Sequence, residues 1–148
     1  TMLAIGCDHG GFQLKKAIEA YLEERGIEYK DFGCPDETSV DYPPIAAAVA
    51  HSIANGECER GILCCGTGIG MSISANKVDG VRAAVCTEPY STEMTRRHNN
   101  CNCLCLGGRV LSPEKALELV RIYLDTPYEG GRHQRRLDMI AQIERGEL

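Results

Sequence analysis

A cysteine stands directly before three alternating glycines in the segment Cys65-Gly66-Thr67-Gly68-Ile69-Gly70. Glycines allow consecutive backbone N–H groups to converge on a bound anion, and a helix that begins after them adds the positive end of its dipole. The same surroundings favour the thiolate form of a neighbouring cysteine. We therefore expect an anion-binding loop beside a thiol that can act as a base or a nucleophile.

Only one of two adjacent cysteines can belong to this loop. Cys64 and Cys65 end an apolar run that is typical of a strand, in which consecutive side chains point to opposite faces. Cys65 is the better candidate because it immediately precedes Gly66. The alternative interpretation of Cys65 is a buried thiol with a packing role.

The loop differs from the common nucleotide-binding motifs. No Gly-Lys-Ser/Thr sequence follows it, as a Walker motif requires, and its glycines are not spaced as G-x-G-x-x-G. We therefore expect no nucleotide cofactor. The spacing of Cys103 and Arg109 matches that of thiol phosphatases, but Cys103 lies inside an alternating strand pattern instead of at the start of a loop.

Composition limits the class of protein. The chain has 148 residues, which favours a single domain over residues 1–148, and its net charge of -5 argues against binding to nucleic acid or a membrane surface. No apolar run approaches the roughly 18 residues that a membrane-spanning helix needs. Residues 2–9 lack the basic region of a signal peptide, so we expect a cytoplasmic location.

Nine cysteines are many for a chain of this length. A reducing compartment disfavours a disulfide scaffold, and most of these cysteines are expected to be small buried side chains. The sequence has neither paired C-x-x-C segments nor histidines at ligand spacing, which argues against zinc. Cys101, Cys103 and Cys105 alternate and are expected on one face of a strand, so we predict no metal site.

Strand-like and helix-like segments alternate along the chain. Apolar runs predict strands over residues 2–7, 27–32, 61–65, 82–86 and 103–106. Helical periodicity predicts helices that end before Gly26 and near Gly56, helices over about 70–76 and 90–98, one opened by Ser112 and Pro113, and a last one after Gly131. This order predicts a Rossmann-like fold with three α/β/α layers and a five-stranded parallel sheet.

Ligands bind to such sheets beyond the carboxyl ends of the strands. Segments rich in glycine and polar residues follow those ends here, at positions 7–11, 65–70, 86–88 and 107–109. One edge of the sheet is therefore expected to carry the functional site.

The last predicted helix has a basic part and an apolar part on one face. Arg132 and Arg136 lie four residues apart, and Ile140 and Ile143 continue the same stripe. The two guanidinium groups suit a phosphate clamp, and the alternative is a solvated basic face. The apolar part predicts that this C-terminal helix docks on a partner subunit.

Seven segments match, in the same order, motifs of one known family. They are Gly6–His9, Asp41–Pro43, Gly61–Lys77, Cys86–Ser91, Arg97–Asn99, Gly107–Val110 and Tyr128–His133. In these segments, which extend over nearly the whole chain, the sequence resembles the type B ribose-5-phosphate isomerases and the related galactose-6-phosphate isomerase subunits.

The resemblance implies that the chain interconverts D-ribose 5-phosphate and D-ribulose 5-phosphate through an enediolate, without metal or cofactor, in the non-oxidative pentose phosphate pathway. Cys65 is implied to move the proton between C1 and C2. Thr67 and the backbone amides of the loop are implied to hold the enediolate oxygen; these amides belong to Gly66, Gly68, Ile69 and Gly70. One branch of the family uses a glutamate at the position of Met71, and because methionine cannot accept the proton, Cys65 keeps the role of base.

Further roles follow from the same resemblance. His98 is implied to open the furanose ring, with help from Asp8 and Asn99, whereas its alternative role is that of a helix-end histidine favoured by the dipole. Tyr42 is implied to form a wall of the sugar pocket. The residues implied to bind the phosphate are His9, Arg109, Arg132 and Arg136.

Family members act as dimers in which His98, Asn99 and Arg109 reach into the neighbouring site, so the resemblance implies a homodimer with shared active sites, or a tetramer of the same chain. The other two histidines, His51 and His133, are expected at the surface. Two alternatives for the function are an isomerase of allose 6-phosphate or galactose 6-phosphate and a noncatalytic phosphosugar sensor.

Overall fold

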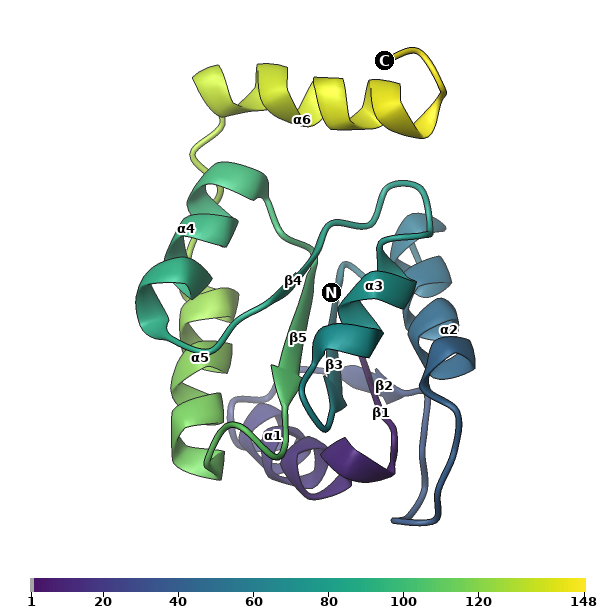
Figure 1. The fold of residues 1–148 in the computed structure, drawn as a ribbon. Helices are drawn as coiled ribbons and strands as arrows, with labels where there is room; N and C mark the ends of the chain where they lie inside the picture. The colour runs from purple at the N-terminus through teal and green to yellow at the C-terminus, as the bar shows by residue number, and fades with distance from the viewer. Residues whose placement is uncertain (1) are drawn as a thin grey trace.

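A five-stranded parallel sheet forms the centre of the computed structural model, which describes residues 2–148 (Figure 1). The strand order is β2-β1-β3-β5-β4. The strands are β1 (Leu3–Cys7), β2 (Tyr29–Asp31), β3 (Arg60–Cys65), β4 (Ala83–Val85) and β5 (Cys103–Gly107). Because Cys7 pairs with Cys64, and Cys65 with Gly107, strands β1, β3 and β5 end level with one another.

Helices cover both faces of the sheet, which confirms the predicted three-layer fold (Figure 1). One layer contains α1 (Phe12–Glu24), α4 (Pro89–Asn99) and α5 (Pro113–Asp125), and the other contains α2 (Tyr42–Ala54) and α3 (Ile69–Ala75). A single 3-10 turn, η1 (His9–Gly11), precedes α1. The last helix, α6 (Arg132–Glu144), packs on α4 and extends across one end of the molecule.

The start of α5 illustrates how local sequence sets these elements. The hydroxyl of Ser112 accepts a hydrogen bond from the Lys115 amide at 3.2 Å, and Pro113 occupies the first helical position, as predicted. No helix within residues 2–148 combines the length and the apolar character that crossing a membrane requires.

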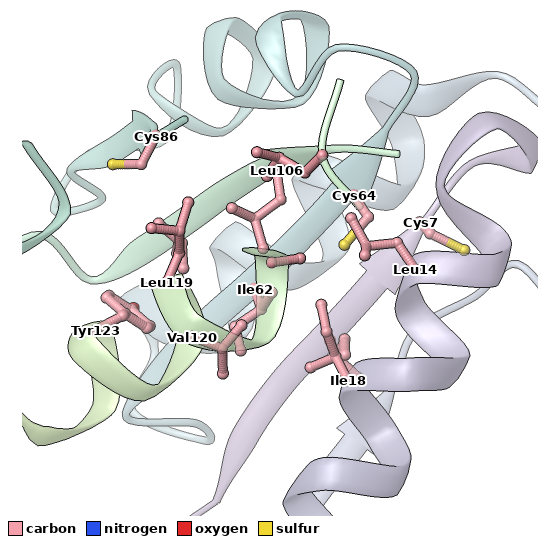
Figure 2. Close-up of a cluster of buried hydrophobic side chains, with 14 of the residues drawn as sticks. Cys7, Leu14, Ile18, Ile62, Cys64, Cys86, Leu106, Leu119, Val120 and Tyr123 are labelled. Carbon is pink, nitrogen blue, oxygen red and sulfur yellow. The ribbon is translucent and has the colours of Figure 1, made fainter. Parts of the chain in front are cut away.

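The strands bury side chains on both faces because helices cover both. Between the sheet and helices α1 and α5 lies one cluster (Figure 2), to which the labelled residues Cys7, Ile18, Ile62, Cys64 and Leu119 belong. A second cluster faces α2 and α3 and includes Cys65. Cys64 and Cys65 therefore point to opposite faces, as the strand pattern predicts, and all nine cysteines are buried and unpaired by disulfides.

The prediction that three alternating cysteines share one strand face is wrong for Cys101. Cys103 and Cys105 belong to the cluster against α2 and α3, whereas Cys101 belongs to the opposite cluster. Cys101 precedes β5, and its amide donates to the carbonyl of Thr95 in α4 at 3.0 Å. The period-two rule does not apply there because the backbone has not yet entered the strand.

Three ionisable groups meet where α1 crosses the end of β2. The buried ammonium of Lys15 lies 2.7 Å from the carboxylate of Asp31 and also donates to the carbonyl of Cys34. Glu19 lies one helical turn farther along and is buried as well. Burial and the neighbouring Asp31 raise the pKa of Glu19 to about 7.

This raised pKa predicts a pH-dependent stability that Glu19→Gln removes. The folded state holds a proton on Glu19 up to about pH 7. The stability that protonation of Glu19 contributes is therefore complete below the ordinary carboxyl pKa and is lost as the pH rises through 7. In urea denaturation between pH 5 and pH 8, the variant should gain stability relative to the unsubstituted protein as the pH rises. Glu24→Gln, on the exposed face of the same helix, serves as control, and parallel stability curves for Glu19→Gln and the parent would contradict the prediction.

Candidate functional site

Backbone hydrogen bonds join the loops that follow β1, β3 and β5. The amide of Gly108 donates to the carbonyl of Cys65 at 2.7 Å, and that of Arg109 to the carbonyl of Gly66 at 3.0 Å. The amide of Asp8 donates to the carbonyl of Cys64 at 3.1 Å. The carboxyl edge of the sheet is therefore a continuous set of three loops.

The approach of these loops requires glycine. A Cβ atom on Gly11 would lie 2.4 Å from the carbonyl carbon of Cys64, and one on Gly108 would lie 2.5 Å from the carbonyl oxygen of Gly10. Both distances are far below van der Waals contact with rigid backbone. Glycines in the segments that follow β1 and β5 therefore allow these loops to pack against the loop after β3.

Cys65 ends β3 with its thiol turned into the following loop. Its Sγ atom accepts a hydrogen bond from the Gly68 amide at 3.0 Å, and only 5% of the residue is exposed. Gly68 makes this bond possible because its φ of 84° turns the chain back toward the sulfur. A backbone N–H directed at sulfur stabilises a thiolate, as a base requires.

Thr67 stands next to this thiol at the exposed side of the loop. Its hydroxyl oxygen accepts a hydrogen bond from the Ile69 amide at 3.2 Å, which leaves the hydroxyl hydrogen to donate to a ligand. The amides of Gly68 and Ile69 already donate to the Cys65 sulfur and to this hydroxyl, so the Thr67 hydroxyl, rather than these two amides, can hold an oxyanion beside Cys65.

Asp8 and His9 follow β1 into the same edge. One carboxylate oxygen of Asp8 accepts a hydrogen bond from the Gly10 amide at 2.8 Å, and the residue is 7% exposed. The Nδ1 atom of His9 accepts from the Val40 amide at 3.3 Å. This contact places the proton of a neutral imidazole on Nε2, which becomes a donor suited to a phosphate oxygen.

Tyr42 and Arg109 flank the loop. The ring of Tyr42 lies so close to Gly70 that a Cβ atom there would be 2.6 Å from a ring carbon. The guanidinium of Arg109 would be 3.0 Å from a Cβ atom on Gly66. Arg109 follows β5 by two residues and lies against the loop of its own chain, whereas the resemblance implied that it reaches into the neighbouring site.

The remaining predicted site residues lie at the amino edge of the sheet. Asn99 ends α4, and its carbonyl accepts a hydrogen bond at 3.1 Å from Arg82, which directly precedes β4. The ring of His98 stacks on that of His133 in α6, with centroids 4.2 Å apart. Arg132 and Arg136 are exposed on α6 itself.

One chain therefore divides the predicted site between two edges. Strand β5 has five residues, so at about 3.3 Å per residue the edges are roughly 16 Å apart. A small sugar phosphate cannot touch Cys65 and His98 of the same chain across that distance.

The prediction that His133 is a surface residue is wrong. His133 and Leu137 are the buried side chains of α6, and both face α4. His133 is 6% exposed, and its Nε2 atom lies 3.3 Å from a carboxylate oxygen of Glu129. The four-residue spacing of His133 and Leu137 could have indicated this face, but the stripe that begins with Arg132 is more conspicuous in the sequence.

His98, Glu129 and His133 offer ligand atoms within 4.8 Å of one another, and they are the residue types that zinc prefers. The two imidazole rings are inclined by only 18°. Nearly parallel stacked rings do not direct their lone pairs at one ion. Stacking on the buried His133 does, however, restrict the orientation of His98, so the cluster is suited to positioning His98.

Comparison with known proteins identifies relatives over almost the whole chain. The family profile described as Ribose/Galactose Isomerase matches residues 3–140. Ribose-5-phosphate isomerase B of Escherichia coli (strain K12) is 51% identical over 142 residues, which cover 96% of this chain and 95% of that protein.

Solved structures agree with this match. Ribose-5-phosphate isomerase B of Clostridium thermocellum superposes with a TM-score of 0.98 at 47% identity, covering 100% of each chain. Ribose-5-phosphate isomerase B of Mycoplasma genitalium, solved with bound ribulose-5-phosphate, superposes with a TM-score of 0.92 at 38% identity, covering 97% of this chain and 96% of that chain.

The geometry of the loop predicts different costs for two glycine substitutions. Gly68→Ala and Gly80→Ala both force alanine into the left-handed region, at φ of 84° and 89°, which costs roughly 1 kcal/mol. A Cβ atom at Gly68 also lies 3.0 Å from the backbone of Leu106, whereas Gly80 has no heavy atom of the described chain within 4 Å. Urea denaturation at one protein concentration should show the larger loss of stability for Gly68→Ala, and equal losses would refute the packing argument.

Proposed function

The chain belongs to the ribose/galactose isomerase family and is an isomerase, as its sequence predicted, and on this premise we propose that it interconverts D-ribose 5-phosphate and D-ribulose 5-phosphate. The observation that carries the proposal is the Cys65 thiol, 3.0 Å from the Gly68 amide in the loop after β3. Support for the substrate comes from the E. coli relative and from the M. genitalium enzyme solved with ribulose-5-phosphate.

Cys65 acts as the base in this proposal. Its thiolate removes the proton from C2 of the open-chain aldose, the electron pair forms the C1–C2 double bond, and negative charge develops on O1. Thr67 and the amides of Gly66 and Gly70 hold that oxygen, where one good donor contributes on the order of 3 kcal/mol. The thiol then returns the proton to C1 as O1 is protonated and the hydroxyl on C2 loses its proton to become the ketone.

Further residues open the sugar ring, form the wall of the sugar pocket and bind the phosphate. His98 donates the proton that opens the furanose ring, with Asp8 and Asn99 hydrogen-bonding to the sugar. Tyr42 forms one wall of the sugar pocket. The phosphate is bound by imidazole and guanidinium donors, namely His9, Arg109, Arg132 and Arg136.

The active site is completed by a second copy of the chain. Support comes from the separation of about 16 Å between the edge with Cys65 and the edge with His98. Helix α6 also exposes Ile140 and Ile143, at 42% and 59%, beside a cavity that both side chains line with Asn99. Docking of this apolar surface buries it and brings His98 and the α6 arginines to the neighbouring carboxyl edge.

Six-carbon sugar phosphates are the second candidate substrates, because the family description includes galactose isomerases. Turnover rates with ribose 5-phosphate, allose 6-phosphate and galactose 6-phosphate on the purified protein distinguish these substrates. A noncatalytic sensor would bind them without exchanging a carbon-bound proton in deuterated water. The cytoplasmic location stays a prediction.

Cys65→Ala tests the assignment of the base. Turnover should fall on the order of 10³-fold, because general-base catalysis is lost, and exchange of the C2 proton with deuterated water should stop. Cys64→Ala is the matched control, since it removes a thiol one residue away on the opposite face. Comparable losses in both variants, or normal exchange in Cys65→Ala, would sink the assignment.

Mixing two inactive variants tests the shared site. Cys65→Ala and Arg132→Met affect opposite edges, so a mixed dimer regains one complete site. After equimolar unfolding and refolding together, about half of the dimers are mixed and each has one complete site of two, which gives about a quarter of the parent activity. Cys65→Ala mixed with Thr67→Ala is the control, because both affect the same loop and no complete site forms. Recovery in the control, or none with Arg132→Met, would contradict the arrangement.

A further inference from the structure

Three arginines outside the proposed active site converge on a second cavity. Arg60, Arg82 and Arg96 line a space of about 250 Å³ at the amino edge of the sheet. Arg60 begins β3, Arg82 precedes β4 and Arg96 lies in α4, so three separate elements contribute one guanidinium each. The other lining residues are Glu59, Asn100 and Asn102.

Neutral oxygens hold these guanidinium groups in place. Arg96 is 3% exposed and donates from Nη1 to the Asn100 side chain at 2.9 Å and from Nε to the carbonyl of Thr126 at 3.1 Å. Arg82 donates from Nη2 to the carbonyl of Asn100 at 3.0 Å. Arg60 donates to the carbonyl of Tyr123 at 2.8 Å.

The positive charge of this cluster is not neutralised by ion pairs. Among residues 2–148, the salt bridges within 4.0 Å involve none of the three arginines. Burial and the charges of Arg60 and Arg82 lower the pKa of Arg96. Buried cations in proteins are ordinarily paired with an anion, whereas here one buried and two half-buried guanidinium groups line one cavity and donate to neutral oxygens, which favours binding of an anion.

We propose that this cavity is a second anion site that binds a phosphate group, distinct from the site at the Cys65 loop. Guanidinium forks match the oxygens of phosphate. Glu59 is the one carboxylate in the lining, so a dianion balances the two positive charges that remain. A volume near 250 Å³ accepts inorganic phosphate or the head of a small phosphate ester and is too small for a dinucleotide.

Asn100→Asp tests the site with almost no change in shape. The substitution places a carboxylate 2.9 Å from Arg96, where it competes with a bound anion. Asn100 has a φ of 47°, and aspartate tolerates this left-handed conformation as asparagine does. Asn55→Asp is the control, because it adds the same charge outside the cavity lining.

Calorimetric titration with inorganic phosphate is done in the Arg132→Met background, which weakens phosphate binding at the proposed active site. One phosphate per chain should still bind, Asn100→Asp should weaken it at least tenfold, and Asn55→Asp should leave it within twofold. Arg60→Gln, which removes a different guanidinium, should also weaken it at least tenfold. Loss of binding of both inorganic phosphate and glycerol 3-phosphate in Arg132→Met, or equal affinities in Asn100→Asp and Asn55→Asp, would overturn the proposal.

A parallel titration with glycerol 3-phosphate identifies the source of the phosphate group. Binding of inorganic phosphate assigns the free anion, and binding of the ester alone assigns a phosphorylated metabolite. If neither binds in the Arg132→Met background, the cavity is not a phosphate site.

Thermal unfolding without phosphate should give Asn100→Asp a melting temperature equal to or above that of its parent, because its carboxylate pairs with the arginines. A lower melting temperature would contradict the conclusion that the positive charge of the cavity lacks an ion-pair partner.

Discussion

Backbone contact among three loops at the carboxyl edge of the sheet is the constraint on which the site depends. Gly11 lies against the carbonyl of Cys64, and Gly108 against the carbonyl of Gly10, at separations that exclude any side chain. The level ends of β1, β3 and β5 bring these loops to one height, and the hydrogen bond from Gly108 to Cys65 joins them. Because the backbones of the three loops pack around Cys65, main-chain contacts rather than flexible side chains hold the thiol beside the Gly68 amide.

The same parallel topology explains why one chain cannot hold the proposed active site alone. A helix that returns from the carboxyl edge ends at the amino edge, so α4 delivers His98 and Asn99 to the side opposite Cys65. The buried His133 and Leu137 anchor α6 to α4 there, whereas its arginines and later isoleucines face outward. The proposed sharing of sites between copies thus follows from helix direction, and it couples association to catalysis in the proposed mechanism.

Buried charge is distributed unevenly between the two ends of the sheet. Lys15 is paired with Asp31 inside the fold, so its burial is compensated within the chain. Arg96, equally buried, donates to carbonyl and amide oxygens, lies 6.0 Å from the centroid of the Tyr123 ring and shares its cavity with Arg60 and Arg82. The difference matters because an uncompensated buried cation raises the energy of the folded state, and a bound anion removes that cost.

Local chemistry and periodicity sufficed to predict the capping of α5 by Ser112 and the opposite directions of Cys64 and Cys65, because each depends on neighbouring residues alone. The parallel sheet was predictable because strands that alternate with helices along the chain return in the same direction. The family, too, follows from motifs read in order along the chain. Three-dimensional packing decided the rest. Cys101 lies outside the expected strand face because its amide donates to the carbonyl of Thr95 in α4 before β5 begins. His133 is buried because α6 packs on α4. The convergence of Arg60, Arg82 and Arg96 was invisible for the same reason, since contacts between residues far apart in sequence depend on how the elements pack.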